Sequence, residues 1–325
     1  MSLTFTELEA VTNSYFAANN KKAVDIYFDD SFLADRWLKG KKGLFLRPPG
    51  GKNIRVPLSY DGQEGGFYSR ADVLSSDDRE SINAAYFNWK HAYGNATVYR
   101  TDELENANVY AEVELVNSKL EGAQKTIRKW IAQNFYAANG DSSALITGLR
   151  SMCSESAGVA YGHIAENDLV SNDGTKPWEG KTNTTEEAIS LPVIRTLRSD
   201  AKIGNGAQGK PNLVTMPEDL FNVIKGILET QKRYVDDPDT AKAGFVHVVF
   251  EGAILAADDY CPSGYAAAIN EAHAGVAIHS QGFFVRTPWA NLLAAGIAAR
   301  STKILFDGNM ICNNRKAHKM HSNLT

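Results

Sequence analysis

A long amphipathic segment between Glu103 and Ala138 constrains the fold of this chain more than any other feature. Positions spaced alternately by three and four residues form one stripe, which is the pattern of a helix with a buried face. The stripe contains Val109, Val113, Val116, Leu120, Ala123, Ile127, Trp130 and Asn134, widened by Ile131 and Phe135. Such a helix would be roughly 45–50 Å long, about three times the average. Asn139-Gly140 provides a C-terminal stop.

Residues 43–78, which precede this helix, predict an extended two-stranded ribbon. In residues 53–60 the apolar Ile54, Val56, Leu58 and Tyr60 alternate with Asn53, Arg55, Pro57 and Ser59. Pro57 is tolerated in mid-strand only where no partner needs its missing N–H. The glycine-rich turn 61–66 then leads into a second strand, 67–74. Because an isolated ribbon is marginal in water, it must pack on its own core or on another subunit.

The other segments predict a mixed α+β fold. Short helices are expected at 3–16 and 22–38, and an aromatic-rich strand at 84–100. Between 144 and 285 helices near 185–199 and 217–230 alternate with short strands, followed near the end by a strand, a turn and a strand over 303–314. The predicted strands are 212–215, 245–250, 253–255, 266–269 and 275–278.

Composition excludes several functional classes. The chain has 325 residues, 43% hydrophobic and 22% charged, with a net charge of −4. This charge lacks the basic excess that sequence-specific DNA binding uses. The three cysteines are too dispersed for a disulfide framework or a zinc cluster. Neither a signal peptide nor a membrane span is visible, so we expect the protein to remain inside a cell.

A nucleotide-binding motif is imitated by residues 204–210, which match both G-x-G-x-x-G and G-x-x-x-x-G-K. Phosphate binding needs a helix N-terminus directly afterwards, and the P-loop also needs Ser or Thr where Pro211 stands. A strand is predicted there instead. A glycine-rich loop is therefore favoured over a phosphate site.

The remaining candidate chemical groups have simpler interpretations. His318 and His321 are interpreted as solvated tail residues, and His247 as a histidine of the core or sheet edge. Asp258 to Pro262 is interpreted as a loop, because adjacent residues on an extended chain point in opposite directions. No catalytic residue, metal ligand or cofactor is predicted.

Five motifs in this order carry a resemblance to the major capsid proteins of tailed bacteriophages with the Hong Kong 97-type fold. They are Thr101 to Ala107, Ile146 to Leu149, Trp178 to Gly180, Leu213 to Pro217 and Phe306 to Arg315. None is a catalytic signature, and the resemblance covers nearly the whole chain. It implies an N-terminal arm (1–46), an extended loop that overlaps a neighbouring subunit (47–78), a peripheral domain with the spine helix (79–140), an axial domain (141–285) and a return to the peripheral domain (286–325).

The resemblance also implies function and partners. The chain would assemble as pentamers and hexamers into an icosahedral shell around the double-stranded DNA of a phage, inside the host bacterial cytoplasm. Separate scaffolding and portal proteins, and a decoration protein, would be its partners, and packaged DNA would lie near it without specific binding. An encapsulin-like nanocompartment shell and a nucleotide-dependent enzyme are the alternatives.

Six residues are candidates for contacts between subunits, with register and specificity as the expected effect of the charged ones. They are Arg47, Lys52, Arg55, Tyr60, Phe67 and Arg70.

Overall fold

The structure is a computed structural model and describes residues 31–40, 42–63, 65–70, 72–74, 81–105, 109–154, 160–171, 174–204, 209–230 and 247–325. The helix predicted at 3–16 and most of the one at 22–38 lie outside these ranges. Of the second helix, α2 (Phe32–Leu38) is described.

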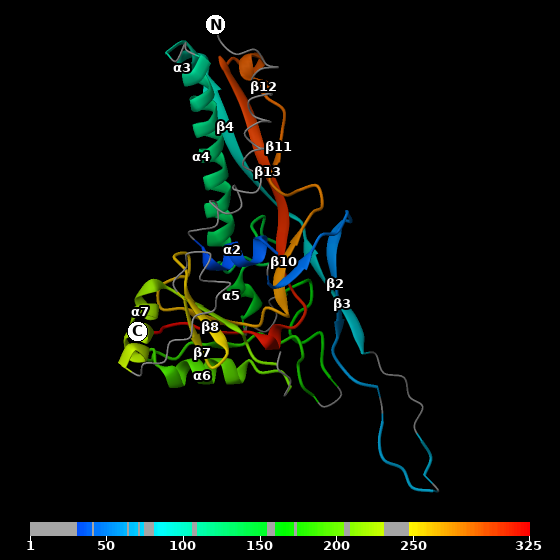
Figure 1. The fold of residues 1–325 in the computed structure, drawn as a ribbon. Helices are drawn as coiled ribbons and strands as arrows, with labels where there is room; N and C mark the ends of the chain where they lie inside the picture. The colour runs from blue at the N-terminus through cyan, green and yellow to red at the C-terminus, as the bar shows by residue number, and fades with distance from the viewer. Residues whose placement is uncertain are drawn as a thin grey trace.

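A long, mainly antiparallel sheet forms the elongated part of the molecule (Figure 1). Its central strand, β13 (Ala299–Cys312), pairs with β4 (Lys90–Tyr99) along one edge. The other edge of β13 pairs along its length with β10 (Ala274–Ile278), β11 (Val285–Arg286) and β12 (Ala290–Asn291). A short strand, β1 (Leu44–Leu46), adds in parallel to β10. The sheet therefore depends on one strand of unusual length.

The strand, turn and strand predicted over 303–314 are wrong, because β13 runs through Asp307-Gly308 without interruption. Gly308 pairs with Ile278 on one side and with Lys90 on the other. At Asp307-Gly308 the backbone of β13 is paired with β10 on one side and with β4 on the other. These two sets of hydrogen bonds outweigh the preference of Asp-Gly for a turn.

The predicted long helix is confirmed as α4 (Val109–Phe135), preceded by the short α3 (Arg100–Glu105). Its 27 residues give a length of about 40 Å. Val116, Leu120 and Ile127 are fully buried within the main core cluster, which also contains Ala96 and Val98 of β4. Trp130 departs from the prediction, since it is 54% exposed. The helix also ends at Phe135, three residues earlier than predicted.

A second, mixed sheet forms the other part of the body. Its strand order is β5 (Thr182–Asn183), β14 (Lys319–His321), β9 (Ala266–Ile269), β6 (Leu213–Met216), β8 (Ala253–Ala257) and β7 (His247–Phe250). The helices α6 (Leu191–Asp200) and α7 (Glu218–Thr230) pack apolar faces against it, making a separate core cluster. A single turn, α5 (Leu149–Met152), follows α4. The alternation of helices and strands predicted for this region is confirmed.

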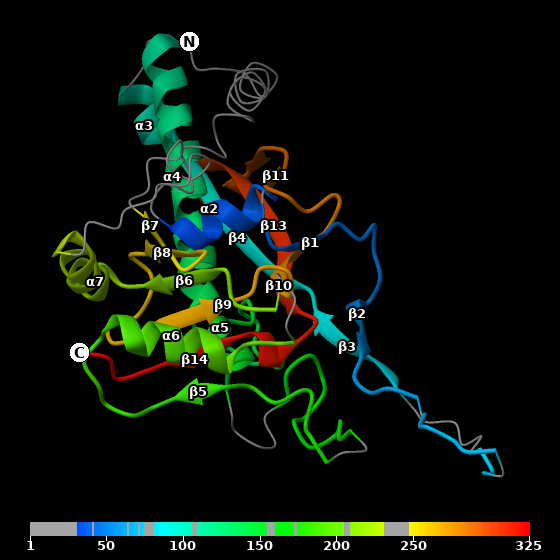
Figure 2. The ribbon, with the colours of Figure 1, turned by 60° about the horizontal axis from the view of Figure 1, so that its bottom comes forward.

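The ribbon exists, but its pairing differs from the prediction. β2 (Asn53–Ser59) pairs with β3 (Ile82–Asn88), not with residues 67–74. The predicted alternation holds, since Ile54, Val56 and Leu58 are buried within the main core cluster. Both views show the ribbon projecting from the body (Figures 1 and 2). Pro57 is accommodated because β2 has one partner strand among the described residues.

Polar contacts fix α2 against the body. Ser31 caps the helix, and buried Asp258, in the loop after β8, accepts hydrogen bonds from the Ser31 hydroxyl and the Leu33 amide. Arg36 forms a bidentate pair with Glu271, whose side chain is 3% exposed. Burial raises the pKa of Asp258, while the amides of Leu33 and Tyr260 lower it. The loop predicted at 258–262 is thus an anchoring point.

Each of the two sheets contains strands from both sides of the domain boundary predicted after residue 285. β10, from the predicted axial segment, pairs with β13 of the long sheet. β14, from the predicted returning segment, pairs with β9 of the second sheet. The five-segment division stays a prediction, with sheet membership crossing this boundary in both directions.

Candidate assembly surfaces

The described residues between β2 and β3 form an extended loop that projects from the body (Figure 1). At its base the Tyr60 amide donates to the Ser81 carbonyl oxygen, which closes the ladder. Farther out, the Ser69 amide donates to Asp72 and the Asp72 amide donates to the Ser69 carbonyl oxygen. Residues 65–70 and 72–74 are all exposed.

Apolar side chains on this loop are strongly exposed. Phe67 and Val73 have essentially no protein neighbours, at 110% and 98% relative exposure, and Tyr68 and Leu74 are more than half exposed. Burying a side chain of this kind is worth about 1.5–3 kcal/mol. An apolar group this exposed on a projecting segment indicates a surface that another molecule covers.

The structure divides the predicted contact residues between the base and the tip of the ribbon. Arg47, Lys52 and Arg55 are exposed near the base, whereas Phe67 and Arg70 are exposed on the loop. Arg47 lies over the rings of Phe45 and Phe283 at 5.2 and 5.7 Å.

Among the predicted contact residues are four cations, Arg47, Lys52, Arg55 and Arg70. None of them forms an ion pair with another described residue. Tyr60 is partly buried against the main core of its own chain. The side chain of Tyr60 is therefore only partly available to a neighbour, and the other five predicted residues are exposed.

A second surface, which the sequence does not predict, is a cleft of about 520 Å³ between α4 and β4. Lys90 to Asn95 form one wall, and Thr126, Ile127, Trp130, Ile131 and Asn134 form the other, with Ala144 to Ile146 at the end. No residue of β13 lines the cleft, and β4 pairs with β13 alone among the described strands. Tyr93, Trp130 and Leu145 are 65%, 54% and 45% exposed around it.

The buried end of this cleft contains a desolvated cation. The Lys90 ammonium donates hydrogen bonds to the main-chain carbonyls of Asp141 and Ser143. Burial lowers the pKa of Lys90, while the charge of Asp141 raises it. Since Lys90 bonds to its own chain, the surface that the cleft presents is mainly apolar.

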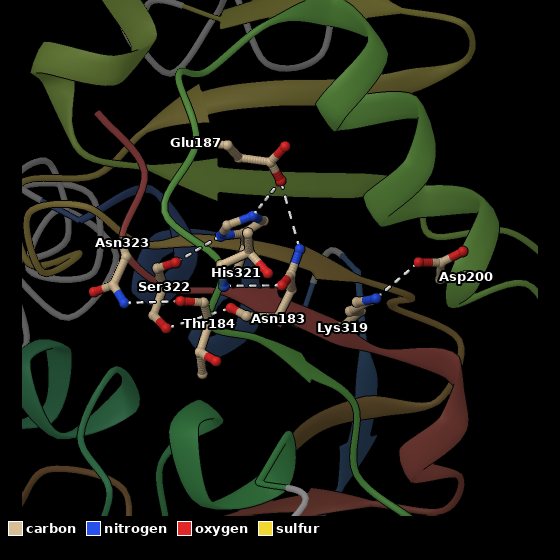
Figure 3. Close-up of polar contacts among 9 residues, drawn as sticks. Asn183, Thr184, Glu187, Asp200, Lys319, His321, Ser322 and Asn323 are labelled. Carbon is tan, nitrogen blue, oxygen red and sulfur yellow. Dashed lines mark hydrogen bonds and ion pairs between the residues drawn. The ribbon is translucent and has the colours of Figure 1, made fainter.

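The C-terminal segment is locked into the second sheet, which corrects the prediction of a solvated tail. His321 is 1% exposed, and its ring nitrogens lie 2.6 Å from a Glu187 carboxylate oxygen and 2.7 Å from the Ser322 carbonyl oxygen (Figure 3). Lys319 pairs with Asp200, and the Asn323 side chain donates to the Thr184 carbonyl oxygen. His318 is fully buried, its Nδ1 accepting from the Asn270 amide.

The described residues hold no arrangement typical of a metal or nucleotide site. No group of three or more His, Cys, Asp or Glu within them could bind a metal ion. Of the glycine-rich 204–210 segment, residues 205–208 lie outside the described ranges, and β6 follows it rather than a helix. The strand predicted after this loop is confirmed. Likewise, no described helix is long and apolar enough to cross a membrane.

The spine helix on a long sheet, the projecting ribbon and the second mixed sheet together define the Hong Kong 97-type capsid fold. Comparison with solved structures supports this class with high coverage. A cyanophage A-1(L) capsid chain aligns with a TM-score of 0.67 at 15% identity, covering 91% of this chain and 94% of that one. A capsid chain of a native GTA particle aligns with a TM-score of 0.59 at 11% identity, covering 88% and 89%.

Shell proteins of another kind share the same fold. The SrpI encapsulin of Synechococcus elongatus PCC 7942 aligns with a TM-score of 0.55 at 9% identity, covering 90% of this chain and 89% of that one. No protein-family model and no curated protein sequence matches the chain. At these identities the likeness is one of fold.

Proposed function

We propose that this chain is the major capsid protein of a tailed bacteriophage. It assembles as pentamers and hexamers into the icosahedral head that encloses the double-stranded DNA genome. Its place is the virion, and its assembly takes place in the host bacterial cytoplasm. A scaffolding protein, a portal and a decoration protein are its proposed partners, and its role is structural rather than enzymatic.

The observation that carries this proposal is the projecting loop with Phe67, Tyr68, Val73 and Leu74 exposed on it. These side chains contribute little to the stability of a single subunit, because they are exposed to solvent in it. A contact between two different surfaces of identical subunits propagates, and it closes into a ring when the rotation between subunits permits. Rings joined in many copies make a stable container from modest contacts. The Hong Kong 97-type fold supplies the scaffold for such contacts.

A nanocompartment shell is the second candidate, favoured by the alignment with the SrpI encapsulin. The two functions differ in what the shell contains. Particles purified from the native source would hold double-stranded DNA in the first case and an enzyme cargo in the second. Nuclease treatment followed by nucleic-acid and protein analysis of the opened particles distinguishes them.

Electron microscopy of purified protein tests the shell function directly. A variant that lacks the loop between β2 and β3 is compared with the wild type. It should retain β2, whose Ile54, Val56 and Leu58 belong to the core. Residues 61–80 are therefore replaced by Asn-Gly, a two-residue hairpin turn that joins Tyr60 to Ser81 across their existing hydrogen bond. We expect closed shells or capsomer rings from the wild type and folded, unassembled protein from this variant.

A matched control keeps the loop length and replaces Phe67, Tyr68, Val73 and Leu74 by Ser. Because these side chains are exposed, the control should unfold at the temperature of the unassembled wild type. Loss of shells in both variants supports the apolar loop as the assembly element. A wild-type protein that stays a compact monomer under all assembly conditions contradicts the proposed function.

A further inference from the structure

A pocket of about 420 Å³ lies at the β5 edge of the second sheet and shares no residue with the cleft between α4 and β4. Thr182 of β5 and Met320 of β14 are paired in register, and both line the pocket. Thr184 and Ser322 follow two residues later and line it as well. Side chains two residues apart on extended chain share a face, so one face of the sheet edge forms the floor of the pocket. The Thr184 side chain accordingly points away from Glu187, which lies over the opposite face (Figure 3).

The lining of this pocket combines one cation with hydroxyl groups and contains no carboxylate. Arg150 of α5 is the only charged residue among the eight that line it, and Ala138 and Met320 are apolar. The other five carry hydroxyls, namely Ser154, Thr182, Thr184, Tyr265 and Ser322. The volume is that of a small-ligand site, and its polar groups are a positive charge and neutral hydrogen-bond donors. Such a lining favours an anion.

Three polar side chains of the pocket form no hydrogen bond with another described residue. The Arg150 guanidinium is partly buried and lies 4.8 Å from the centre of the Tyr265 ring, and it has no ion pair within the described part of the chain. The hydroxyls of Tyr265 and Thr184 likewise have no partner there. By contrast, the hydroxyls of Thr182 and Ser322 donate to main-chain carbonyls. The ring of Tyr265 therefore holds the guanidinium in place and leaves its N–H donors free for a ligand.

Donors from three walls of the pocket favour a phosphate group over a carboxylate. Arg150 comes from α5, Thr184 from the chain that follows β5, and Tyr265 from the turn before β9. A guanidinium fork binds two oxygens of either anion side by side. A planar carboxylate has no further oxygen to offer the other walls, whereas a tetrahedral phosphate keeps one or two.

We propose that this pocket binds a phosphate group, with the Arg150 guanidinium as its cationic donor and the Tyr265 and Thr184 hydroxyls as neutral donors. All eight lining residues belong to one chain, so the site is independent of the proposed shell function. Free phosphate, a phosphomonoester and a nucleic-acid backbone carry the same group, and binding measurements with different probes distinguish them.

Titration calorimetry of the unassembled full-length protein with inorganic phosphate, at constant ionic strength, tests the site. We expect one saturable site per chain, with competition by sulfate and none by chloride or acetate. Arg150→Gln should weaken phosphate binding by about tenfold or more, because a charge-assisted, two-pronged contact is lost. Tyr265→Phe keeps the ring beneath the guanidinium and removes one donor, so it should weaken binding by about threefold to tenfold.

The matched control is Arg55→Gln, which removes an exposed cation that does not line the pocket. Its affinity for phosphate should equal that of the wild type. Unfolding temperatures measured without phosphate show whether each variant is folded. Added phosphate should raise the unfolding temperature of the wild type and of Arg55→Gln, because a ligand that binds the folded state stabilises it, and should raise that of Arg150→Gln much less.

A single-stranded oligonucleotide without terminal phosphates distinguishes the sources of the phosphate group. Oligonucleotide binding that Arg150→Gln weakens supports the site and assigns it to a nucleic-acid backbone, whereas binding of inorganic phosphate alone supports it and assigns it to free phosphate or a phosphomonoester. Equal weakening by Arg150→Gln and Arg55→Gln would overturn the site in favour of non-specific attraction. Competition by acetate as strong as that by sulfate would overturn the choice of phosphate, and wild-type protein without saturable binding would overturn the site itself.

Discussion

At the scale of single residues, Arg315 shows how one buried cation can join distant segments. It is 1% exposed and donates hydrogen bonds to four main-chain carbonyls, those of Ser151, Met152, Ser154 and Trp178. Its guanidinium also lies 5.2 Å from the centre of the Tyr161 ring. Burial lowers the pKa of Arg315, and no carboxylate lies within ion-pair distance among the described residues. The carbonyl bonds therefore offset much of the cost of burying the charge.

Replacing Arg315 should destabilise the fold strongly. Arg315→Met removes the guanidinium donor from four carbonyls, and we expect the free energy of unfolding to fall by about 3–5 kcal/mol. Arg315→Lys should also lose stability, because an ammonium cannot reproduce the planar donor geometry. Denaturant unfolding of the unassembled protein measures both. The control Arg55→Met, at an exposed position, should change stability by less than about 0.5 kcal/mol. An unchanged stability for Arg315→Met would refute the role of this cation.

His318 should make stability dependent on pH. Burial lowers its pKa to about 3, with a smaller contribution from the charge of His273. In the unfolded chain a histidine titrates near its ordinary value of about 6.5. Below that pH the unfolded state binds a proton that the folded state does not, so stability falls as pH drops from about 6.5 toward 3. Between pH 7 and pH 5 the loss from this residue is about 2 kcal/mol.

The variant His318→Asn should remove that part of the pH dependence, since Asn offers an acceptor to the Asn270 amide and no titrating group. Unfolding curves collected at pH 7 and pH 5 on both proteins measure the difference. His163→Asn is the matched control, because His163 is exposed and has a positive φ of 58° that Asn tolerates. An identical pH dependence in wild type and His318→Asn would show that His318 does not contribute.

At the scale of elements, two glycines test how tightly the spine helix packs on the sheet. A Cβ at Gly94 of β4 would lie 2.4 Å from the Ala123 carbonyl oxygen of α4, which is backbone and cannot move alone. A Cβ at Gly122, in the same helix, would meet nothing within 4 Å. The first glycine permits the close approach of strand and helix, whereas the second only adds flexibility to the unfolded chain.

We expect these two positions to respond in opposite directions. Gly94→Ala should lower the free energy of unfolding by about 1–3 kcal/mol through forced separation of α4 from β4. Gly122→Ala should raise it by about 0.5–1 kcal/mol. Thermal unfolding of the unassembled variants ranks them. Equal effects at both sites would contradict the close packing of α4 on β4.

At the scale of the whole molecule, folding and assembly should be separable. The loop replacement of residues 61–80 leaves both core clusters intact, so its intrinsic stability should match that of the unassembled wild type. Assembly binds the folded state only, which raises the apparent unfolding temperature in proportion to the logarithm of protein concentration. Calorimetry over a range of concentrations should show this rise for wild type and a constant value for the loop variant. A rise in both would place the main assembly contact elsewhere.

The proposed contact surfaces were partly predictable from the sequence. The extended loop and five exposed candidate residues follow from alternation, glycine content and the family resemblance. The cleft between α4 and β4 does not, because Trp130 lies within the apolar stripe of the helix. Periodicity assigns a residue to the apolar face of a helix, but it does not say whether the neighbouring element covers that position. Trp130 lines the cleft between α4 and β4 and is 54% exposed.

The sequence by itself determined the features that depend on local pattern: the spine helix, the alternation of Ile54, Val56 and Leu58, and the strand after the glycine-rich loop. Only the tertiary structure decided that β2 pairs with β3, that β13 continues through Asp307-Gly308, and that His318 and His321 are buried. Local patterns report conformational preference and apolar faces within one segment. Strand pairing and burial depend on segments far apart in the chain, and their combined packing outweighs the local preference of a turn or a polar tail.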